Sequence, residues 1–163
     1  MSGTIAVGDF RGGLLTVLEE LFEQVHGYLL DPGISLFETL ATISAEEASR
    51  PISAQSANLA AQVNHVRFYL NALLTGPPPE GHSVDWSSSW RMGAVTDEEW
   101  QDLIARLRAT YGQLRGFATT FDGWDARFVG GAFAMVGHCA YHLGEIRQGL
   151  GVLRGAPDPD TAR

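Results

Sequence analysis

The sequence predicts an all-α protein, a four-helix bundle with a long loop between its second and third main helices. Three observations predict this fold: four segments repeat apolar residues at helical spacing, no segment alternates as a half-buried strand does, and glycine or proline clusters separate the segments. Amphipathic helices without strands bury their apolar faces against one another. We expect a single domain over residues 1–155, followed by a disordered tail at 156–163.

The first predicted helix runs from about Asp9, which suits an N-cap, to Leu30, and the sequence Asp31-Pro32-Gly33 stops it. Its apolar face consists of Leu14, Leu18, Leu21, Val25 and Tyr28. A short helical piece is expected from Leu36 to Ile43. The stretch from Glu46 to Pro51 is expected to break the helical pattern.

The second predicted helix runs from about Ser53 to Thr75, where a glycine and three prolines end it. Its apolar stripe consists of Leu59, Val63, Val66, Leu70 and Leu73, and a polar wedge of Asn64, Arg67 and Asn71 lies away from that stripe. The connection from Gly76 to Val95 is long, and such loops are often functional in compact domains. It carries Trp86 and Trp90, so we expect it to be pinned against the bundle as a lid.

The third predicted helix opens with a capping box, Thr96 and Glu99, and runs to about Phe121. Its apolar face consists of Trp100, Leu103, Ile104, Leu107, Tyr111 and Leu114. The fourth runs from about Asp125 to Arg154 and is apolar almost all round, which is typical of a helix buried on more than one side. Glycines recur along it every seven residues, at Gly130, Gly137, Gly144 and Gly151. They reflect either a glycine-rich composition or a smooth seam for a helix of this chain or of a second subunit.

The charge and composition exclude several classes of function. The net charge is −8 and the arginines are scattered, which disfavours binding to nucleic acid or to an anionic membrane surface. No apolar run approaches the roughly 20 residues of a membrane span, and the first ten residues do not resemble a signal peptide, so we expect a cytoplasmic protein. All eleven basic residues are arginine, which excludes lysine-dependent Schiff-base and phosphate-loop chemistry.

Histidines provide the residues that carry chemistry. His138 and His142 are four residues apart on the last predicted helix, so they lie on one face and can converge on one metal ion. Such a pair also occurs as two hydrogen-bonded core histidines. His65 lies on the second helix away from its polar wedge, and a buried lone histidine needs a partner. Three inward histidines from two helices of a bundle can share one ion.

Two motifs resemble the DinB-like (DinB/YfiT) superfamily of metal-binding four-helix bundles: NHVRFYL at residues 64–70 and GHCAYHLGEIRQ at residues 137–148. In that family one histidine comes from the second helix and two come from a His-x-x-x-His on the last. The resemblance implies that His65, His138 and His142 bind a divalent metal ion, with zinc or nickel favoured and iron or manganese also compatible. It covers nearly the whole chain, but Leu143 replaces an arginine common in the family, and Glu145 stands where glutamine is usual.

The remaining candidates surround this site. Glu145 shares the face of His138 and His142, so it is a candidate catalytic residue that orients a ligand or accepts a proton, or else it pairs with Arg147 or solvent. We expect three aromatic residues, Tyr69, Trp86 and Trp90, to contact a substrate. The sequence predicts that His26 is a boundary histidine, that His82 is solvated and that Cys139, the only cysteine, is a small buried residue.

Three imidazoles leave a coordination position open, as in catalytic zinc sites. The resemblance implies a homodimeric, metal-dependent enzyme with a small-molecule substrate, either a transferase that joins a low-molecular-weight thiol to an electrophile or a hydrolase. Two alternatives stay open. One is a non-catalytic binding or assembly module in which the metal braces a dimer. The other is a metal-free bundle that binds a small apolar ligand.

Overall fold

The computed structural model describes residues 3–155 and contains six α-helices, one 3-10 helix and no strand in that range. The long helices are α1 (Val7–Phe22), α4 (Leu59–Thr75), α5 (Asp97–Thr120) and α6 (Ala126–Arg154), and the short ones are α2 (Leu36–Leu40), α3 (Ala45–Ser49) and the 3-10 helix η1 (Trp86–Trp90). The all-α prediction is confirmed. The predicted disordered tail at 156–163 lies outside the described residues.

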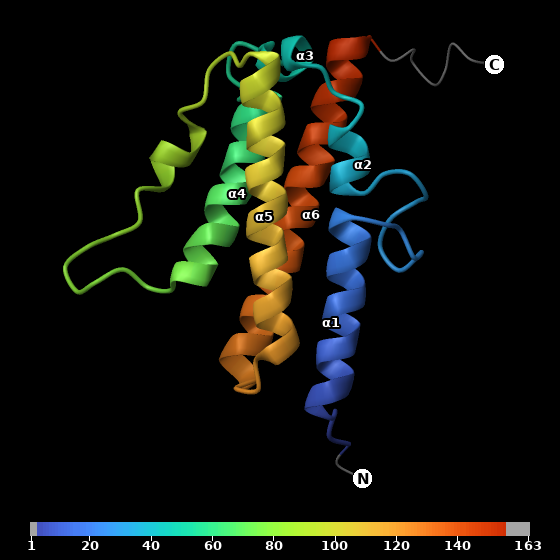
Figure 1. Ribbon diagram of the computed structural model, residues 1–163, viewed down its shortest axis with the longest axis vertical. Coiled ribbons are helices and arrows are strands. Elements are labelled where there is room, and N and C mark those ends of the chain that lie inside the picture. Colours follow the sequence, from blue (N-terminus) through green and yellow to red (C-terminus); the bar gives the residue numbers. More distant parts are fainter. Residues whose placement is uncertain (1–2, 156–163) are drawn as a thin grey trace.

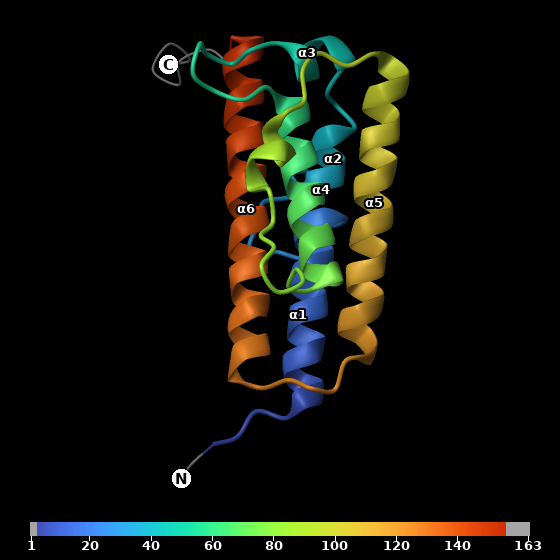
Figure 2. The same ribbon diagram turned by 90° about the vertical axis from the view of Figure 1, so that its left-hand side faces the viewer.

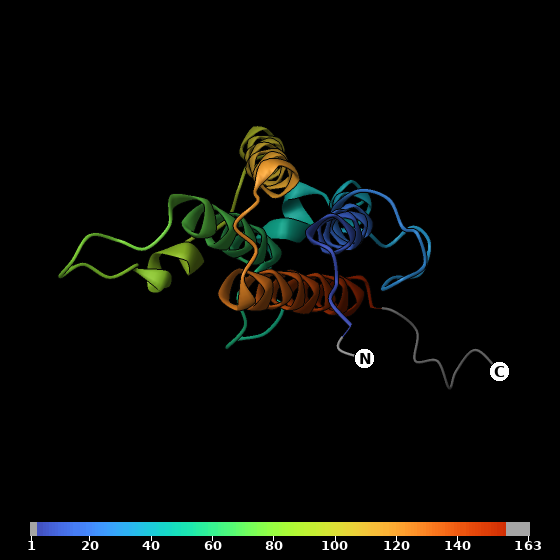
Figure 3. The same ribbon diagram turned by 90° about the horizontal axis from the view of Figure 1, so that it is seen from below.

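The four long helices lie alongside one another (Figure 1). Viewed along their length, α5 and α6 lie on opposite sides, with α1 and α4 between them (Figure 3). Accordingly, α1 and α4 each pack against both α5 and α6. No helix in residues 3–155 is long and apolar enough to cross a membrane.

The direction of the helices explains the long connection between α4 and α5. These two helices run in the same direction, opposite to α1 and α6 (Figure 1). The chain must therefore travel back along the length of α4, which is roughly 26 Å for 17 residues, before α5 can begin. The returning segment, residues 76–96, passes over the side of the molecule formed by α4 and α6 and carries η1 there (Figure 2).

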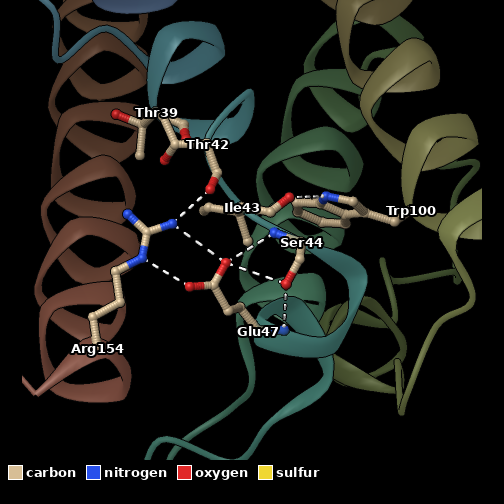
Figure 4. Close-up of polar contacts among 7 residues, drawn as sticks. All are labelled: Thr39, Thr42, Ile43, Ser44, Glu47, Trp100 and Arg154. Carbon is tan, nitrogen blue, oxygen red and sulfur yellow. Dashed lines mark hydrogen bonds and ion pairs between the residues drawn. The ribbon is translucent and has the colours of Figure 1, made fainter.

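The apolar core is one continuous cluster to which all six α-helices contribute. Phe22 of α1 stacks on Tyr111 of α5 with ring centroids 4.5 Å apart, which joins two helices that are distant in sequence. Trp100 is buried, and its Nε1 donates to the carbonyl oxygen of Ile43 at 2.9 Å (Figure 4). The indole therefore fills the core without leaving its polar atom unpaired.

Helix α1 ends at Phe22, well before the predicted end at Leu30. The cause is Glu20, a buried side chain whose carboxylate accepts the backbone N–H groups of Tyr28, Leu29 and Leu30 at 2.7–2.9 Å. Gly27, with φ of 85°, allows the chain to turn back towards it. Tyr28 is consequently 78% exposed and is not part of an apolar helix face.

Three further boundaries differ from the predicted ones. Helix α1 starts at Val7 after an uncapped Ala6, so Asp9 lies inside its first turn. The stretch predicted to break the helical pattern contains α3, which begins with a capping box of Ser44 and Glu47. Helix α4 begins at Leu59, because Asn58 caps it by accepting the N–H of Ala61 at 2.8 Å.

Arg154, in the last turn of α6, attaches that end of the helix to α3 and to the residues just before it. The Nε atom of Arg154 donates to the Glu47 carboxylate at 2.7 Å, and its guanidinium also donates to the carbonyl oxygen of Thr42 (Figure 4). The hydrogen bond from Arg154 and the backbone N–H of Ser44 lower the pKa of Glu47 to about 2. The carboxylate that caps α3 thus also holds the last turn of α6.

The periodic glycines of α6 face no other part of the described chain. A Cβ atom placed on Gly130, Gly137, Gly144 or Gly151 would meet nothing within 4 Å in residues 3–155. Phe133 and Tyr141 on the same helix are 67% and 61% exposed. A seam for a second helix of this chain is therefore wrong for residues 3–155, which leaves composition or a second subunit as the explanation.

Candidate metal centre

The three predicted histidines come together between α4 and α6. One ligand nitrogen from each of His65, His138 and His142 lies within 4.8 Å of the others. Their ring centroids are 4.5–5.3 Å apart, and His65 and His142 are buried while His138 is half-buried. Because α4 and α6 pack against each other and the pair on α6 is one helical turn apart, the backbone itself brings the three rings to one place.

Gln62 fixes the proton on His142. This glutamine lies on α4, one turn before His65, and its buried side-chain oxygen Oε1 is 2.8 Å from Nδ1 of His142. An amide oxygen only accepts hydrogen bonds, so Nδ1 of His142 carries the hydrogen and donates it. The lone pair of His142 is then on Nε2.

Ser89 fixes the proton on His65 in the same way. Its hydroxyl oxygen lies 2.7 Å from Nδ1 of His65 and 2.6 Å from the carbonyl oxygen of Trp86. A carbonyl cannot donate, so the single hydroxyl proton of Ser89 goes to Trp86 and its oxygen accepts from Nδ1 of His65. Nε2 of His65 therefore also carries a lone pair.

His138 contributes an unpaired atom. Its Nε2 is buried and has no hydrogen-bond partner among the described residues. Four other buried side-chain atoms in residues 3–155 also lack a partner, one each on Arg11, Arg67, Tyr111 and Trp124. Only the nitrogen of His138 belongs to a group of ligand atoms from three residues. A buried nitrogen without a partner, in a cluster of three imidazoles, is a donor arrangement that fits a metal ion.

The electrostatics keep all three rings neutral at neutral pH. Burial lowers the pKa of His138, and burial together with the neighbouring His138 lowers the pKa of His65. For His142, burial and the two other histidines lower the pKa to about 4. Neutral imidazole is the form that binds metals, so protons compete little at pH 7.

The donor set fits a divalent ion of borderline softness. Three neutral imidazoles suit zinc, nickel, copper or iron and leave room for a water molecule or a substrate. Nitrogens around a tetrahedral ion at 2.0–2.1 Å stand about 3.4 Å apart. The observed upper limit of 4.8 Å is wider, so the rings would draw together slightly around an ion.

Aromatic side chains surround the histidines. Tyr69 of α4 stacks on His138 with ring centroids 3.9 Å apart, and Trp90 of η1 stacks on His65 at 4.0 Å. The ring centroids of Trp86 and Tyr69 are 6.2 Å apart. Since Trp86 and Trp90 are 44% and 37% exposed, they form the boundary between the histidines and solvent.

Glu145 lies outside the histidine cluster. Its side chain is exposed and forms no hydrogen bond or ion pair with the described residues, Arg147 included. It lines a surface cavity together with Gln62, whose side chain extends to His142. Gln62 therefore accepts the hydrogen bond from His142 that was one of the roles predicted for Glu145. The other predicted role of Glu145, as a proton acceptor, stays a prediction.

Sequence reasoning missed Gln62 and Ser89. Gln62 had a readable signal, because it lies three residues before His65 and so on the same face of a predicted helix. Ser89 had none, because its contact depends on the path of the α4–α5 connection. The other expectations are met: His82 is exposed, His26 lies near Glu19 at the surface, and Cys139 is buried with a pKa raised to about 12 by that burial.

Comparisons of this chain with protein-family models, with curated proteins and with solved structures find no match.

Proposed function

We propose that this protein is a metal-dependent enzyme built on a DinB-like four-helix bundle, with His65, His138 and His142 as the ligands of a divalent ion. The observation that supports the proposal is the arrangement of nitrogens. Two rings have Nδ1 committed to acceptors, and the third has a buried Nε2 without a partner, all within one cluster. Zinc or nickel is the ion we expect, in a cytoplasmic protein.

An ion held by three neutral imidazoles supplies Lewis acidity, which lowers the pKa of a water molecule or thiol at its open position. The residues of the chain do the rest. Gln62 and Ser89 hold Nδ1 of His142 and of His65 in hydrogen bonds, which would leave the Nε2 lone pair of each ring available to an ion. Glu145 is our candidate proton acceptor at the edge of the site, in the cavity that it shares with Gln62.

The aromatic residues define the substrate side of the proposed site. Tyr69, Trp86 and Trp90 carry no charge and offer flat apolar faces beside the histidines. We propose that they exclude water and hold a small molecule by stacking and apolar contact. In the reaction we favour, a low-molecular-weight thiol loses its S–H proton and its sulfur forms a bond to an electrophilic carbon of this molecule. The proton ends on the adduct or leaves with the group that the sulfur displaces. Hydrolysis, in which water takes the place of the thiol, is the other reaction we propose.

Elemental analysis tests the metal. Protein purified without a histidine tag should contain close to one equivalent of a transition metal, and the His142→Ala variant should contain none. The matched control is His82→Ala, because His82 is exposed and does not belong to the histidine cluster. Wild-type protein that neither contains metal nor takes up added zinc or nickel would overturn the proposal.

An activity assay tests the reaction. The metal-loaded protein is mixed with an aromatic electrophile and each of several low-molecular-weight thiols, and consumption of the thiol is followed. Wild type should exceed both His142→Ala and the uncatalysed rate. Equal rates for wild type and His142→Ala, with metal bound to the wild type, would eliminate the transferase reaction and leave hydrolysis to be tested with ester substrates.

The uncovered face of α6 favours a second candidate, a metal-braced dimer without catalysis. Gly130, Gly137 and Gly144 face no other part of residues 3–155, and Phe133 and Tyr141 are exposed beside them. We propose that this face contacts a second copy of the chain, in either candidate. Light scattering should give a dimer mass for wild type and a monomer mass for Gly137→Arg. If the dimer forms and no substrate is turned over, the non-catalytic candidate is favoured.

A further inference from the structure

The η1 segment hydrogen-bonds to the histidine cluster through one fully buried residue, Ser89. Ser89 has no exposed surface, although Trp86 and Trp90 at the ends of η1 are exposed and residues 77–83 of the same connection are exposed throughout. A buried serine in a solvent-exposed segment is unusual, and its polar atoms need partners.

Both polar parts of Ser89 bind consecutive residues of α4. Its hydroxyl oxygen accepts from Nδ1 of His65 at 2.7 Å, and its carbonyl oxygen accepts from the side-chain amide of Asn64 at 2.7 Å. The next residue, Trp90, stacks on the His65 ring. One position of the connection is thus bonded both to the body of α4 and to a proposed metal ligand.

The hydrogen bond to His65 exists only while η1 lies in place. When η1 is closed, the hydroxyl oxygen of Ser89 accepts a hydrogen bond from Nδ1 of His65. The Nε2 lone pair of that ring is then available to an ion. If η1 moved away, the ring would lose its acceptor, and both its tautomer and its rotation would be free. An ion that binds the Nε2 lone pair of His65 therefore stabilises the closed position of η1. By the same coupling free energy, closure of η1 raises the affinity for the ion.

We infer that Ser89 is a positioning residue that couples closure of the Trp86–Trp90 segment to metal binding at the three histidines. The inference rests on the proposed metal site and adds a regulatory property to it. The metal-binding affinity depends on a lid residue, and the lid that borders the substrate side becomes ordered when the ion binds. A metal-free protein would present a looser segment and a more open site.

The test compares Ser89→Ala with Ser88→Ala, since the hydroxyl of Ser88 bonds only to the backbone of the N-cap residue, Asp85. Zinc affinity is measured by competition with a chromophoric chelator, and amide hydrogen exchange over residues 84–92 is measured with and without zinc. In wild type and Ser88→Ala, zinc should slow exchange in this segment. In Ser89→Ala, affinity should fall about 10-fold to 100-fold, and zinc should no longer slow exchange there.

A nitrogen-15 NMR spectrum of the histidine side chains adds a measurement that needs no zinc. In metal-free wild type at pH 7.5, His65 should be the tautomer with its proton on Nδ1, and Ser89→Ala should show a mixture. A proton on Nε2 of His65 in wild type would overturn the inference. So would equal zinc affinities and equal exchange in Ser89→Ala and wild type. Wild-type protein that binds no zinc at all would overturn the proposed function as well, so the two failures are distinguishable.

Discussion

Two regions of this molecule bury titratable side chains, and they differ in the hydrogen-bond partners that those side chains have. On α1, the buried carboxylate of Glu20 receives three backbone N–H donors from the residues that follow the helix. Between α4 and α6, three imidazoles share one space, and the nitrogens that remain available point to no donor or acceptor of the described chain. The first region satisfies its buried charge with groups of the chain itself, and the second groups three ligand atoms that could hold a metal ion.

The difference separates a structural role from a functional one. A buried carboxylate that accepts several N–H groups stabilises the turn it sits in, and here it decides where α1 ends. Buried imidazoles with fixed protons and an unpaired nitrogen lower the stability of the metal-free fold relative to apolar residues of similar size. A loss of fold stability at a group of buried polar side chains is characteristic of a binding site. Each of the following substitutions tests one of the two regions.

The largest expected effect comes from replacing the unpaired ring. In His138→Leu, zinc affinity should fall by more than about 100-fold, because loss of a ligand exceeds the loss of an outer hydrogen bond. The melting temperature of the metal-free protein should stay the same or rise, because the variant removes a buried polar atom that has no partner. Thermal unfolding with and without zinc measures both. A metal-free melting temperature that drops sharply would assign His138 to the structure rather than to the site.

Glu20→Gln should have the opposite pattern. The amide group of glutamine would place a donor against a backbone N–H that now meets an acceptor oxygen, so the turn at Tyr28 to Leu30 loses part of its support. We expect the melting temperature to fall by roughly 5–10 °C with zinc affinity unchanged. Glu23→Gln, at the C-cap of the same helix, is the control, since its carboxylate only reaches Arg115 at 3.9 Å. Identical melting of the two variants would remove Glu20 as the cause of the turn.

The two regions should also respond to acid in different pH windows. The folded pKa of each clustered histidine is lowered, with His142 at about 4. The unfolded chain therefore binds protons first, and the free energy of unfolding falls as the pH falls from about 6.5 towards 4. Burial raises the pKa of Glu20, but its backbone N–H donors lower it below 4.5 overall, so its contribution is lost only below that pH.

Urea unfolding of the metal-free protein across this range measures both windows. His142→Gln should flatten the dependence between pH 6.5 and 4, where one proton taken up on unfolding corresponds to about 1.4 kcal/mol per pH unit. Glu20→Gln should leave that window unchanged and flatten the dependence below pH 4.5. Saturating zinc should raise the free energy of unfolding of wild type without flattening the upper window, because the ion keeps the folded imidazoles unprotonated while those of the unfolded chain still bind protons.

The helices and the histidine site were predictable because local signals agreed with the final packing. The capping box of Thr96 and Glu99 and the apolar period of α5 needed no tertiary information, and the same is true of the spacing of His138 and His142. The capping box of Ser44 and Glu47 is an equally local signal, and it indicates the helix α3 in the stretch predicted to break the helical pattern.

The remaining features depend on contacts between segments. The apolar period continues past Phe22, and only the buried carboxylate of Glu20 and the turn at Gly27 explain why the helix does not. Likewise, Asn64 belongs to a polar wedge in the sequence and is buried in the structure, because η1 covers it. A segment without helical or strand periodicity gives no signal of where it lies, and Ser89 is placed by that segment.

The smallest expected effect on stability comes from a surface ion pair, to which the comparison of buried groups does not apply. Arg154 and Glu47 form an ion pair whose side chains are 43% and 21% exposed, so solvent screens most of their attraction. Arg154→Gln should cost less than about 1 kcal/mol, which corresponds to roughly 2–4 °C in melting temperature for a protein of this size. The cost should shrink further in 1 M salt and as the pH falls from 4.5 towards the Glu47 pKa of about 2, because the ion pair stabilises the fold only while the carboxylate is ionised, and the hydrogen bond from Arg154 to the carbonyl oxygen of Thr42 then remains. Arg106→Gln, which breaks an exposed pair within α5, is the control and should cost still less. A loss for Arg154→Gln as large as that for Glu20→Gln would show that burial is not what separates strong from weak charged contacts in this fold.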